Sequence, residues 1–186
     1  SMVNYKEIYD ISVTLGDEAP VYPGDPAYSR EKVFSLDKGD IAEVSKLTLC
    51  AHSGTHLDLP AHFFRNSPGV DAVPPASFIL PARVLEIEDR QAVGLDELKS
   101  RDTGSGLAVL FKTANSRSGL VRSGRFSEEY VFIRKKAALR LAALKVPLAG
   151  IDYYSVDSFG SHDYPSHRTL LAAGTLILEG IDLAAV

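Results

Sequence analysis

The stretch His52-Ser-Gly-Thr-His56-Leu-Asp58-Leu-Pro-Ala-His62 gathers three of the chain's five histidines and one aspartate within eleven residues. These four residues are separated by four, two and four positions, so every interval is even. In an extended segment successive side chains point to opposite faces, and all four would therefore project from the same side. Neutral imidazole and carboxylate groups suit Zn²⁺, Mn²⁺ or Fe²⁺, and three such ligands leave a position open for water. The stretch therefore predicts a catalytic metal site.

Two alternatives apply to this stretch. His52 and His56 could form an i, i+4 pair on one face of a helix. Gly54, the β-branched Thr55 and Pro60 argue against that helix. Any single member of the four could also orient a metal ligand by hydrogen bonding instead of binding the metal itself.

Further candidate residues lie outside this stretch. His162 and His167 form a second histidine cluster. The pair His162-Asp163 could act with Cys50 as a nucleophile, but nothing around Cys50 resembles an activating context, which favours a small buried residue beside the site. Glu179 is the only acid in a run that otherwise indicates a buried strand, and a buried carboxylate is costly unless it is paired or metal-bound. From the residues alone, a metal role and a surface or arginine-paired role are equally supported for Glu179.

The composition is that of an ordinary globular chain of 186 residues, with 45% hydrophobic and 24% charged residues. This length predicts one domain, residues 1–186. The net charge of −4, without a basic footprint, argues against nucleic acid as a partner. The single cysteine excludes an intrachain disulfide and fits a reducing cytoplasm. We find no bilayer-spanning or signal pattern, so we expect a cytoplasmic protein without a membrane partner.

Apolar patterns predict the secondary structure along the rest of the chain. The predicted strands cover 8–15, 28–34, 42–50, 82–88, 107–112, 146–152 and 175–180, with 28–34 and 42–50 half-buried. The predicted helices cover 94–99, 128–144 and 165–173. Turn-forming residues indicate irregular loops at 20–26 and 68–81, and 115–127 is the best candidate for a mobile surface loop. Strands dominate, which favours a mixed α/β single domain.

Four segments together resemble one known family. The histidine stretch, extended to residue 63, resembles the signature of the metal-dependent cyclase-like hydrolases, which include bacterial kynurenine formamidase and isatin hydrolase. Three more segments are similar to the family pattern: Pro20-Val-Tyr-Pro-Gly-Asp25, Gly150-Ile-Asp-Tyr-Tyr-Ser-Val-Asp157, and His167-Arg-Thr-Leu-Leu followed by Leu178-Glu-Gly-Ile-Asp-Leu183. The similarity extends from about residue 8 to residue 183.

This resemblance implies a centre with two divalent metal ions. It implies that His52, His56 and Asp58 bind the first ion. Asp58 would bridge to a second ion that His167 also binds, and Glu179 would reach both. The step of twelve residues from His167 to Glu179 matches the family spacing, which favours the metal role for Glu179. Zn²⁺ and Mn²⁺ accept the same nitrogen and oxygen ligands, so either ion is expected.

The activity that the resemblance implies is hydrolysis, by metal-activated water, of a small formamide, cyclic amide (lactam), ester or lactone. His62 is implied to be the catalytic proton-transfer residue and not a ligand. Two alternatives remain: a non-catalytic member that binds metal and a small ligand, and a mononuclear Zn²⁺ enzyme that uses only residues 52–62. The implied fold is a mixed-sheet α/β domain of the swivelling β/β/α type, in homodimers or larger homo-oligomers.

Two positions differ from the family pattern. Tyr22 stands where kynurenine formamidases have a tryptophan that packs on the aromatic substrate, and this chain contains no tryptophan. Tyr22 can still stack on a ring, so we expect it in the substrate site. The chain also ends at Val186, before the family's closing strand. We therefore expect a short member, or one whose sheet edge is completed by a neighbouring subunit.

Overall fold

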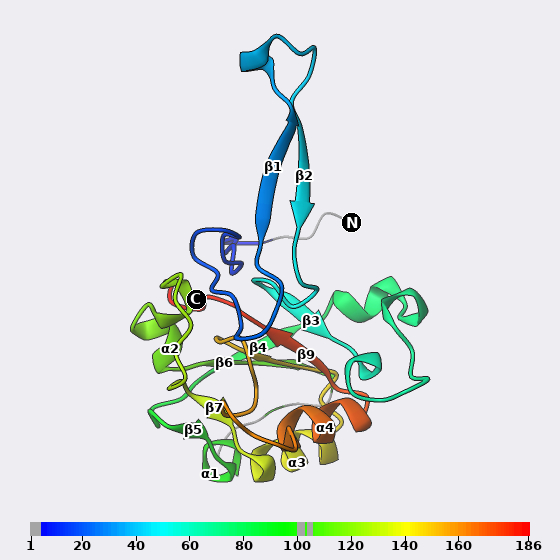
Figure 1. Cartoon of the computed structure of the whole chain (residues 1–186). Helices are drawn as coiled ribbons and strands as arrows, with labels where there is room; N and C mark the ends of the chain where they lie inside the picture. The colour runs from blue at the N-terminus through cyan, green and yellow to red at the C-terminus, as the bar shows by residue number, and fades with distance from the viewer. Residues whose placement is uncertain (1–4, 100–102, 104–105) are drawn as a thin grey trace.

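A mixed sheet forms the centre of the computed structural model, which describes residues 5–99, 103 and 106–186. Within these residues, five strands are hydrogen-bonded in the order β3-β9-β8-β6-β4 (Figure 1). β3 is antiparallel to β9, and the remaining neighbours are parallel. The strand bounds are His56–Asp58 (β3), Ala82–Glu86 (β4), Ala108–Lys112 (β6), Leu148–Ile151 (β8) and Leu176–Glu179 (β9). This arrangement confirms the predicted α/β fold class with a mixed sheet.

Short helices and 3₁₀ turns accompany the central sheet. In the described part of the chain the α-helices are α1 (Leu95–Lys99), α2 (Ala114–Arg117), α3 (Lys135–Ala143) and α4 (Pro165–Ala172). The short strands β5 (Ala92–Val93) and β7 (Phe132–Ile133) pair in parallel outside the central sheet. 3₁₀ turns occupy Leu36–Lys38, Pro60–His62, Val70–Ala72, Pro75–Phe78 and Leu120–Arg122. None of the helices described here has the length and apolarity needed to cross a membrane.

The central strands bury apolar side chains on both faces, as β6 illustrates. Val109 and Phe111 pack in a cluster with residues of α3 and α4, including Leu141. The alternate residues Ala108 and Leu110 point to the opposite face and pack in a second cluster. The helices α3 and α4 lie side by side under one face of the sheet (Figure 1). This packing fixes β8 and β9, whose ends carry residues of the candidate site.

The strands β1 (Ser29–Phe34) and β2 (Val44–Thr48) form an antiparallel hairpin that projects away from the central sheet (Figure 1). Both strands were expected, and the structure confirms them. The prediction that they are half-buried is wrong, because every residue of both strands is exposed. The alternation of apolar and polar residues predicted that one face of each strand packs against the protein. The hairpin instead projects into solvent, and no described residue covers either face.

Residues 8–15 do not form the predicted strand. Side chains use the backbone donors that a strand ladder would need. The backbone N–H of Ser12 donates to Asp10 Oδ1 (2.9 Å), and the N–H of Val13 donates to Thr55 Oγ1 (3.0 Å). One neighbouring and one distant polar side chain thus bind backbone donors of this segment, against its strand propensity.

Two further predictions of secondary structure are wrong in part. The helix predicted over 128–144 begins only at Lys135, because the preceding residues enter β7. The predicted mobile loop 115–127 contains α2 and a 3₁₀ turn, and Asn115, Ser116 and Val121 in it are buried. The side chain of Asn115 exchanges two hydrogen bonds of 2.9 Å with the backbone of Val131. Buried contacts of this kind have no signal in local composition.

Asp152, directly after β8, anchors α2 to the sheet. Its buried carboxylate accepts hydrogen bonds from the N–H of Thr113 (2.7 Å), the hydroxyl of Thr113 (2.8 Å) and the N–H of Ser116 (3.0 Å). The side-chain amide of Asn115 adds a longer contact of 3.4 Å.

Substitution Asp152→Ala is expected to destabilise the fold by about 3 kcal/mol, because it leaves buried donors unsatisfied. Urea unfolding measures this as a lower midpoint with an unchanged slope. Asp163→Ala is the matched control, because Asp163 is exposed. A loss below about 1 kcal/mol, the contribution of one ordinary hydrogen bond, would show that this anchor contributes little.

Candidate metal centre

Strand register brings three of the predicted residues together. β3 pairs with β9 so that His56 lies directly opposite Glu179. Asp58 follows His56 by two positions and points to the same face. His56 Nε2 lies 3.3 Å from Glu179 Oε2 and 3.6 Å from Asp58 Oδ1. One antiparallel strand pair at the sheet edge therefore builds the middle of the site.

His52 reaches the same point from the turn before β3. Its Nδ1 lies 2.8 Å from Asp58 Oδ1. The turn depends on Gly54, at φ 65°, which crosses Gly180, at φ 67°. A Cβ at Gly180 would collide with the carbonyl oxygen of Gly54, so only glycine allows this approach. The hydroxyl of Thr55 donates to the Gly180 carbonyl (2.6 Å), which holds the turn against the end of β9.

His167 comes from the first turn of α4 and is buried. Its backbone N–H donates to Asp157 Oδ2 (3.0 Å), and its Nδ1 lies 2.7 Å from the same oxygen. Its Nε2 then faces the cluster, 3.3 Å from Asp58 Oδ2 and 3.2 Å from Glu179 Oε1. Asp157 therefore orients this ring as carboxylates orient metal-binding histidines.

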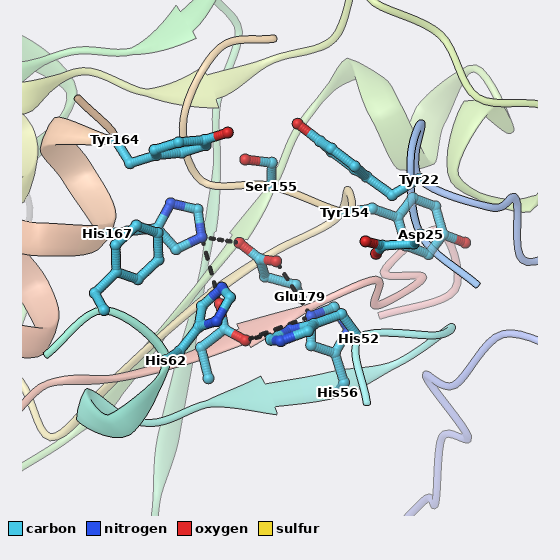
Figure 2. Close-up of a pocket in the computed structure, with 12 residues that line it drawn as sticks. Tyr22, Asp25, His52, His56, His62, Tyr154, Ser155, Tyr164, His167 and Glu179 are labelled. Carbon is cyan, nitrogen blue, oxygen red and sulfur yellow. Dashed lines mark ion pairs between the residues drawn. The ribbon is translucent and has the colours of Figure 1, made fainter. Parts of the chain in front are cut away.

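Each buried carboxylate faces two groups of imidazoles. Asp58 turns Oδ1 toward His52 and His56 and Oδ2 toward His167. Glu179 turns Oε2 toward His56 and Oε1 toward His167 (Figure 2). Two groups of residues could each hold a metal ion, with ligand atoms within 4.8 Å of one another: His52, His56 and Asp58, and Asp58, His167 and Glu179. Asp58 belongs to both groups, as a carboxylate between two ions must.

The donor atoms of this cluster fit a metal ion better than they fit one another. His56 Nε2 and both oxygens of Asp58 are buried, and none has a well-formed hydrogen bond to a described residue. Buried polar atoms are normally hydrogen-bonded, so three neighbouring exceptions point to a missing common partner. Imidazole nitrogen and carboxylate oxygen are donors that Zn²⁺ and Mn²⁺ accept. The residues present therefore fit a divalent cation.

The same contacts change the ionisation of the cluster. Burial lowers the pKa of His56, but Glu179 and Asp58 outweigh burial and raise that pKa to about 9. Burial raises the pKa of Asp58, but the adjacent imidazoles of His167 and His52 outweigh burial and hold that pKa below its usual range. Burial also lowers the pKa of His167, but the negative charge of Glu179 outweighs burial and raises that pKa well above its ordinary value. The carboxylates are thus anionic at neutral pH and attract either protons or metal cations.

His62 lies beside the carboxylate cluster and belongs to neither group of candidate ligands. It ends the 3₁₀ turn after β3, with its ring centroid 4.1 Å from that of His52 and 6.3 Å from that of His167. Burial lowers the pKa of His62, so its imidazole is neutral at physiological pH. A neutral imidazole next to candidate metal ligands can accept a proton.

The prediction that one extended segment carries all four residues is wrong. Only His56 and Asp58 lie in β3, whereas His52 lies in a turn and His62 in a 3₁₀ turn. The left-handed backbone at Gly54 interrupts the extended segment. The alternative of a helical His52–His56 pair is also wrong, because the two rings approach from a turn and a strand, at 5.0 Å.

A pocket of about 300 Å³ opens over the cluster. Tyr22 lines it, with its ring centroid 4.9 Å from that of Phe126. Pattern reasoning missed Asp25, Phe63, Tyr154, Ser155 and Tyr164, which also line the pocket, and the orienting role of Asp157. Asp25, Phe63, Tyr154, Ser155 and Asp157 were visible only as parts of segments similar to the family, and Tyr164 carries no local signal.

The remaining candidates have clear outcomes. Glu179 is buried, so the surface alternative for it is wrong. His162 is exposed and does not line this pocket, although His167 in the same cluster does. Cys50 was expected to be buried, but it is only partly buried, with its Sγ 3.5 Å from Asp25 Oδ2.

Sequence comparisons relate this chain to one protein family. The model of the Cyclase family ("Putative cyclase") matches residues 9–158. Kynurenine formamidase of Geobacillus thermodenitrificans (strain NG80-2) is 32% identical over 174 residues, which cover 94% of this chain and 81% of that protein. Kynurenine formamidase of Polaromonas naphthalenivorans (strain CJ2) is 33% identical over 184 residues, which cover 95% of this chain and 77% of that protein.

Solved structures show the same fold. A "predicted metal-dependent hydrolase" from Bacillus stearothermophilus has a TM-score of 0.80 at 26% identity, covering 96% of this chain and 83% of that one. Isatin hydrolase A from Labrenzia aggregata has a TM-score of 0.77 at 20% identity, covering 93% of this chain and 79% of that one, a likeness of fold alone. Because the family match spans residues 9–158 and the kynurenine formamidases align with nearly all of the chain, this chain belongs to the Cyclase family.

Proposed function

We propose that this chain is a hydrolase that uses metal-activated water to cleave the C–N bond of a small formamide or cyclic amide, or the related bond of an ester or lactone. The observation that carries the proposal is the pair of buried carboxylates, Asp58 and Glu179, each with one oxygen turned toward each imidazole group. The names of the two kynurenine formamidases, which align with most of this chain, support amide cleavage.

The metal centre in this proposal holds two divalent ions, Zn²⁺ or Mn²⁺. His52, His56 and Asp58 would hold one ion, and Asp58, His167 and Glu179 the other, as the two candidate groups support. When bound, such ions lower the pKa of water and polarise a carbonyl group. Asp157 and the carbonyl of Gly54, which contacts His56 Nδ1 at 2.9 Å, hold two of the rings in place.

His62 is the proton-transfer residue in this proposal. Its neutral imidazole nitrogen accepts a proton from the attacking water and returns it to the leaving nitrogen or oxygen. Its place beside His52, outside both ligand groups, supports this role. The ring of Phe63 packs edge-on against the His62 ring, with the two centroids 4.6 Å apart, and so holds the imidazole in place. Tyr22 stacks on a ring of the substrate at the opposite wall.

A panel of formamides, lactams and lactones tests the proposal, with each compound assayed before and after chelation. We expect hydrolysis of at least one formamide or lactam, complete loss of turnover after chelation, and recovery on adding Zn²⁺ or Mn²⁺. Turnover that survives saturating chelator would contradict the metal mechanism. Metal binding without turnover of any compound would instead support a non-catalytic protein that binds metal and a small ligand.

A homo-oligomer is part of the proposal, and the β1–β2 hairpin supports it. A two-stranded hairpin is marginally stable unless something packs on it. This one exposes Phe34, Val44 and Leu47, and Ile41 at its tip is fully exposed. Two copies carry the same apolar hairpin surface, so a two-fold arrangement lets each copy cover the other.

A cytoplasmic location is also part of the proposal. The free thiol of Cys50 supports it.

The double substitution Phe34→Glu with Leu47→Glu is expected to convert the assembly to monomers, because charges would enter the buried interface. Light scattering after size-exclusion chromatography measures the mass. Leu139→Glu is the matched control, because Leu139 is equally exposed but lies on α3. A monomeric wild-type protein, or the same effect from the control, would argue against this interface.

A further inference from the structure

The backbone at Tyr164 is unusual for a tyrosine. Tyr164 has φ 43° and ψ 58°, in the left-handed region, immediately before Pro165 at the start of α4. Bulky residues are rare in this region, and a following proline disfavours helical backbone further. The other non-glycine residues with positive φ in the described chain are Asn66 and Lys145, and neither lines the pocket. Strain of this kind persists where the surrounding structure enforces it, often at binding sites.

This conformation directs the Tyr164 ring over the candidate metal centre. The ring centroid lies 5.5 Å from that of Phe63 and 6.0 Å from that of His167. Figure 2 shows the hydroxyl of Tyr164 turned toward the hydroxyl of Tyr22 on the opposite side of the pocket. Two phenol groups from distant parts of the sequence thus face each other above the carboxylates.

Tyr22 packs against aromatic rings on its side of the pocket. Its ring packs edge-on against Phe126 and lies 6.2 Å from that of Phe159. Burial, followed by the nearby Tyr164 and Glu179, raises the pKa of Tyr22 to about 12. Its phenol is therefore protonated at physiological pH and can donate a hydrogen bond into the pocket.

The pocket favours a neutral acceptor between these hydroxyls. Among the described residues that line it, none is a lysine or an arginine, and Asp25 adds a carboxylate. A substrate carboxylate placed between the two hydroxyls would contact phenols and lie near an aspartate, with no cationic side chain to pair with it. A ketone, amide or ether oxygen needs only a neutral donor. A volume of about 300 Å³ is at the lower end for ligand pockets, which suits a compound with one ring.

We infer that Tyr164 is a specificity-determining residue whose hydroxyl, together with that of Tyr22, binds a neutral acceptor on the substrate. That acceptor lies away from the bond that is cleaved. This inference rests on the proposed hydrolase function. It concerns substrate binding, so it affects KM for one class of compound and leaves the proton transfer unchanged.

Kinetics with formanilide and its 2-, 3- and 4-acetyl derivatives test the inference. We expect the wild-type protein to have a lower KM for at least one acetyl isomer than for formanilide. Tyr164→Phe keeps the ring and removes the hydroxyl. It should raise KM for that isomer about three- to tenfold, the range for loss of a neutral hydrogen bond, with kcat and metal content unchanged. KM for formanilide should stay the same.

Two controls separate binding from structure. Tyr28→Phe removes a hydroxyl outside the pocket and should change neither KM. Tyr164→Asn places a residue that tolerates the left-handed region, so thermal stability should hold while the preference for the acetyl isomer is lost. Equal changes in both KM values, a lower kcat, or no wild-type preference would overturn the inference. If no formanilide is hydrolysed, the lactams and lactones of the panel still test the proposed function separately, and calorimetric binding of the formanilides decides the role of Tyr164.

Discussion

Substitution Asp58→Asn is expected to lower kcat/KM about a thousandfold or more and to remove metal from the protein. Asp58 is the residue shared by both candidate groups, and its two oxygens face different imidazoles. Asparagine keeps the shape but replaces an anionic donor by an amide nitrogen, which cannot bind a cation. Metal centres contribute several kcal/mol of transition-state stabilisation, and each 1.36 kcal/mol is about tenfold in rate. Steady-state kinetics and elemental analysis of the same sample measure both effects.

Two matched variants make this test specific. Asp157→Asn should lower kcat/KM only about 10- to 100-fold, because Asp157 orients the ring of His167 and belongs to neither candidate ligand group. Asp163→Asn, on the exposed part of the same loop, should be neutral. Wild-type metal content and activity in Asp58→Asn would show that this carboxylate is not a bridging ligand.

Substitution His62→Gln is expected to lower kcat about 10²- to 10⁴-fold, the usual contribution of a general acid–base residue. Metal content should stay at the wild-type value, because His62 belongs to neither ligand group. Kinetics and elemental analysis again measure both. The same change at the exposed His162 is the matched control and should have no effect.

The pH profile adds an independent readout for His62. Protonation removes the base, so wild-type kcat/KM should fall on the acid side as pH drops through the pKa of His62. Burial lowers that pKa, so the acid limb should lie below about pH 6.5, the ordinary value for histidine. His62→Gln should remove this limb. Loss of metal in His62→Gln, or an unchanged acid limb, would contradict the proton-transfer role.

Residue types and strand parity explain why part of the histidine and carboxylate cluster could be predicted from the sequence. His56 and Asp58 share a parity that a short strand preserves, and Glu179 stood out as an acid within an apolar run. The neighbours of these residues could not be predicted in the same way. The pairing of His56 with Glu179 joins positions 123 residues apart, which follows from 179 − 56 and depends on tertiary packing. The resemblance to a family, not local pattern, linked the two ends.

Other structural features could not be predicted, because they depend on contacts that local sequence patterns do not encode. The hairpin alternates like a half-buried sheet, yet no described residue covers it. Polar composition indicated a mobile loop at 115–127, yet Asn115 is locked to Val131 within the fold. The ring of Tyr164 reaches the pocket only because of a backbone conformation that tyrosine rarely adopts. Residue propensities therefore could not predict that Tyr164 lines the pocket.

The most direct test of the central claim is the number of metal ions bound per chain. Protein purified without chelator and reconstituted with Zn²⁺ or Mn²⁺ is measured by elemental analysis, with Asp58→Asn as the control. Two equivalents in the wild-type protein, lost in the variant, are the expected result. One equivalent would contradict the binuclear centre and leave His167 and Glu179 with structural roles. No bound metal after reconstitution would contradict the proposed mechanism altogether.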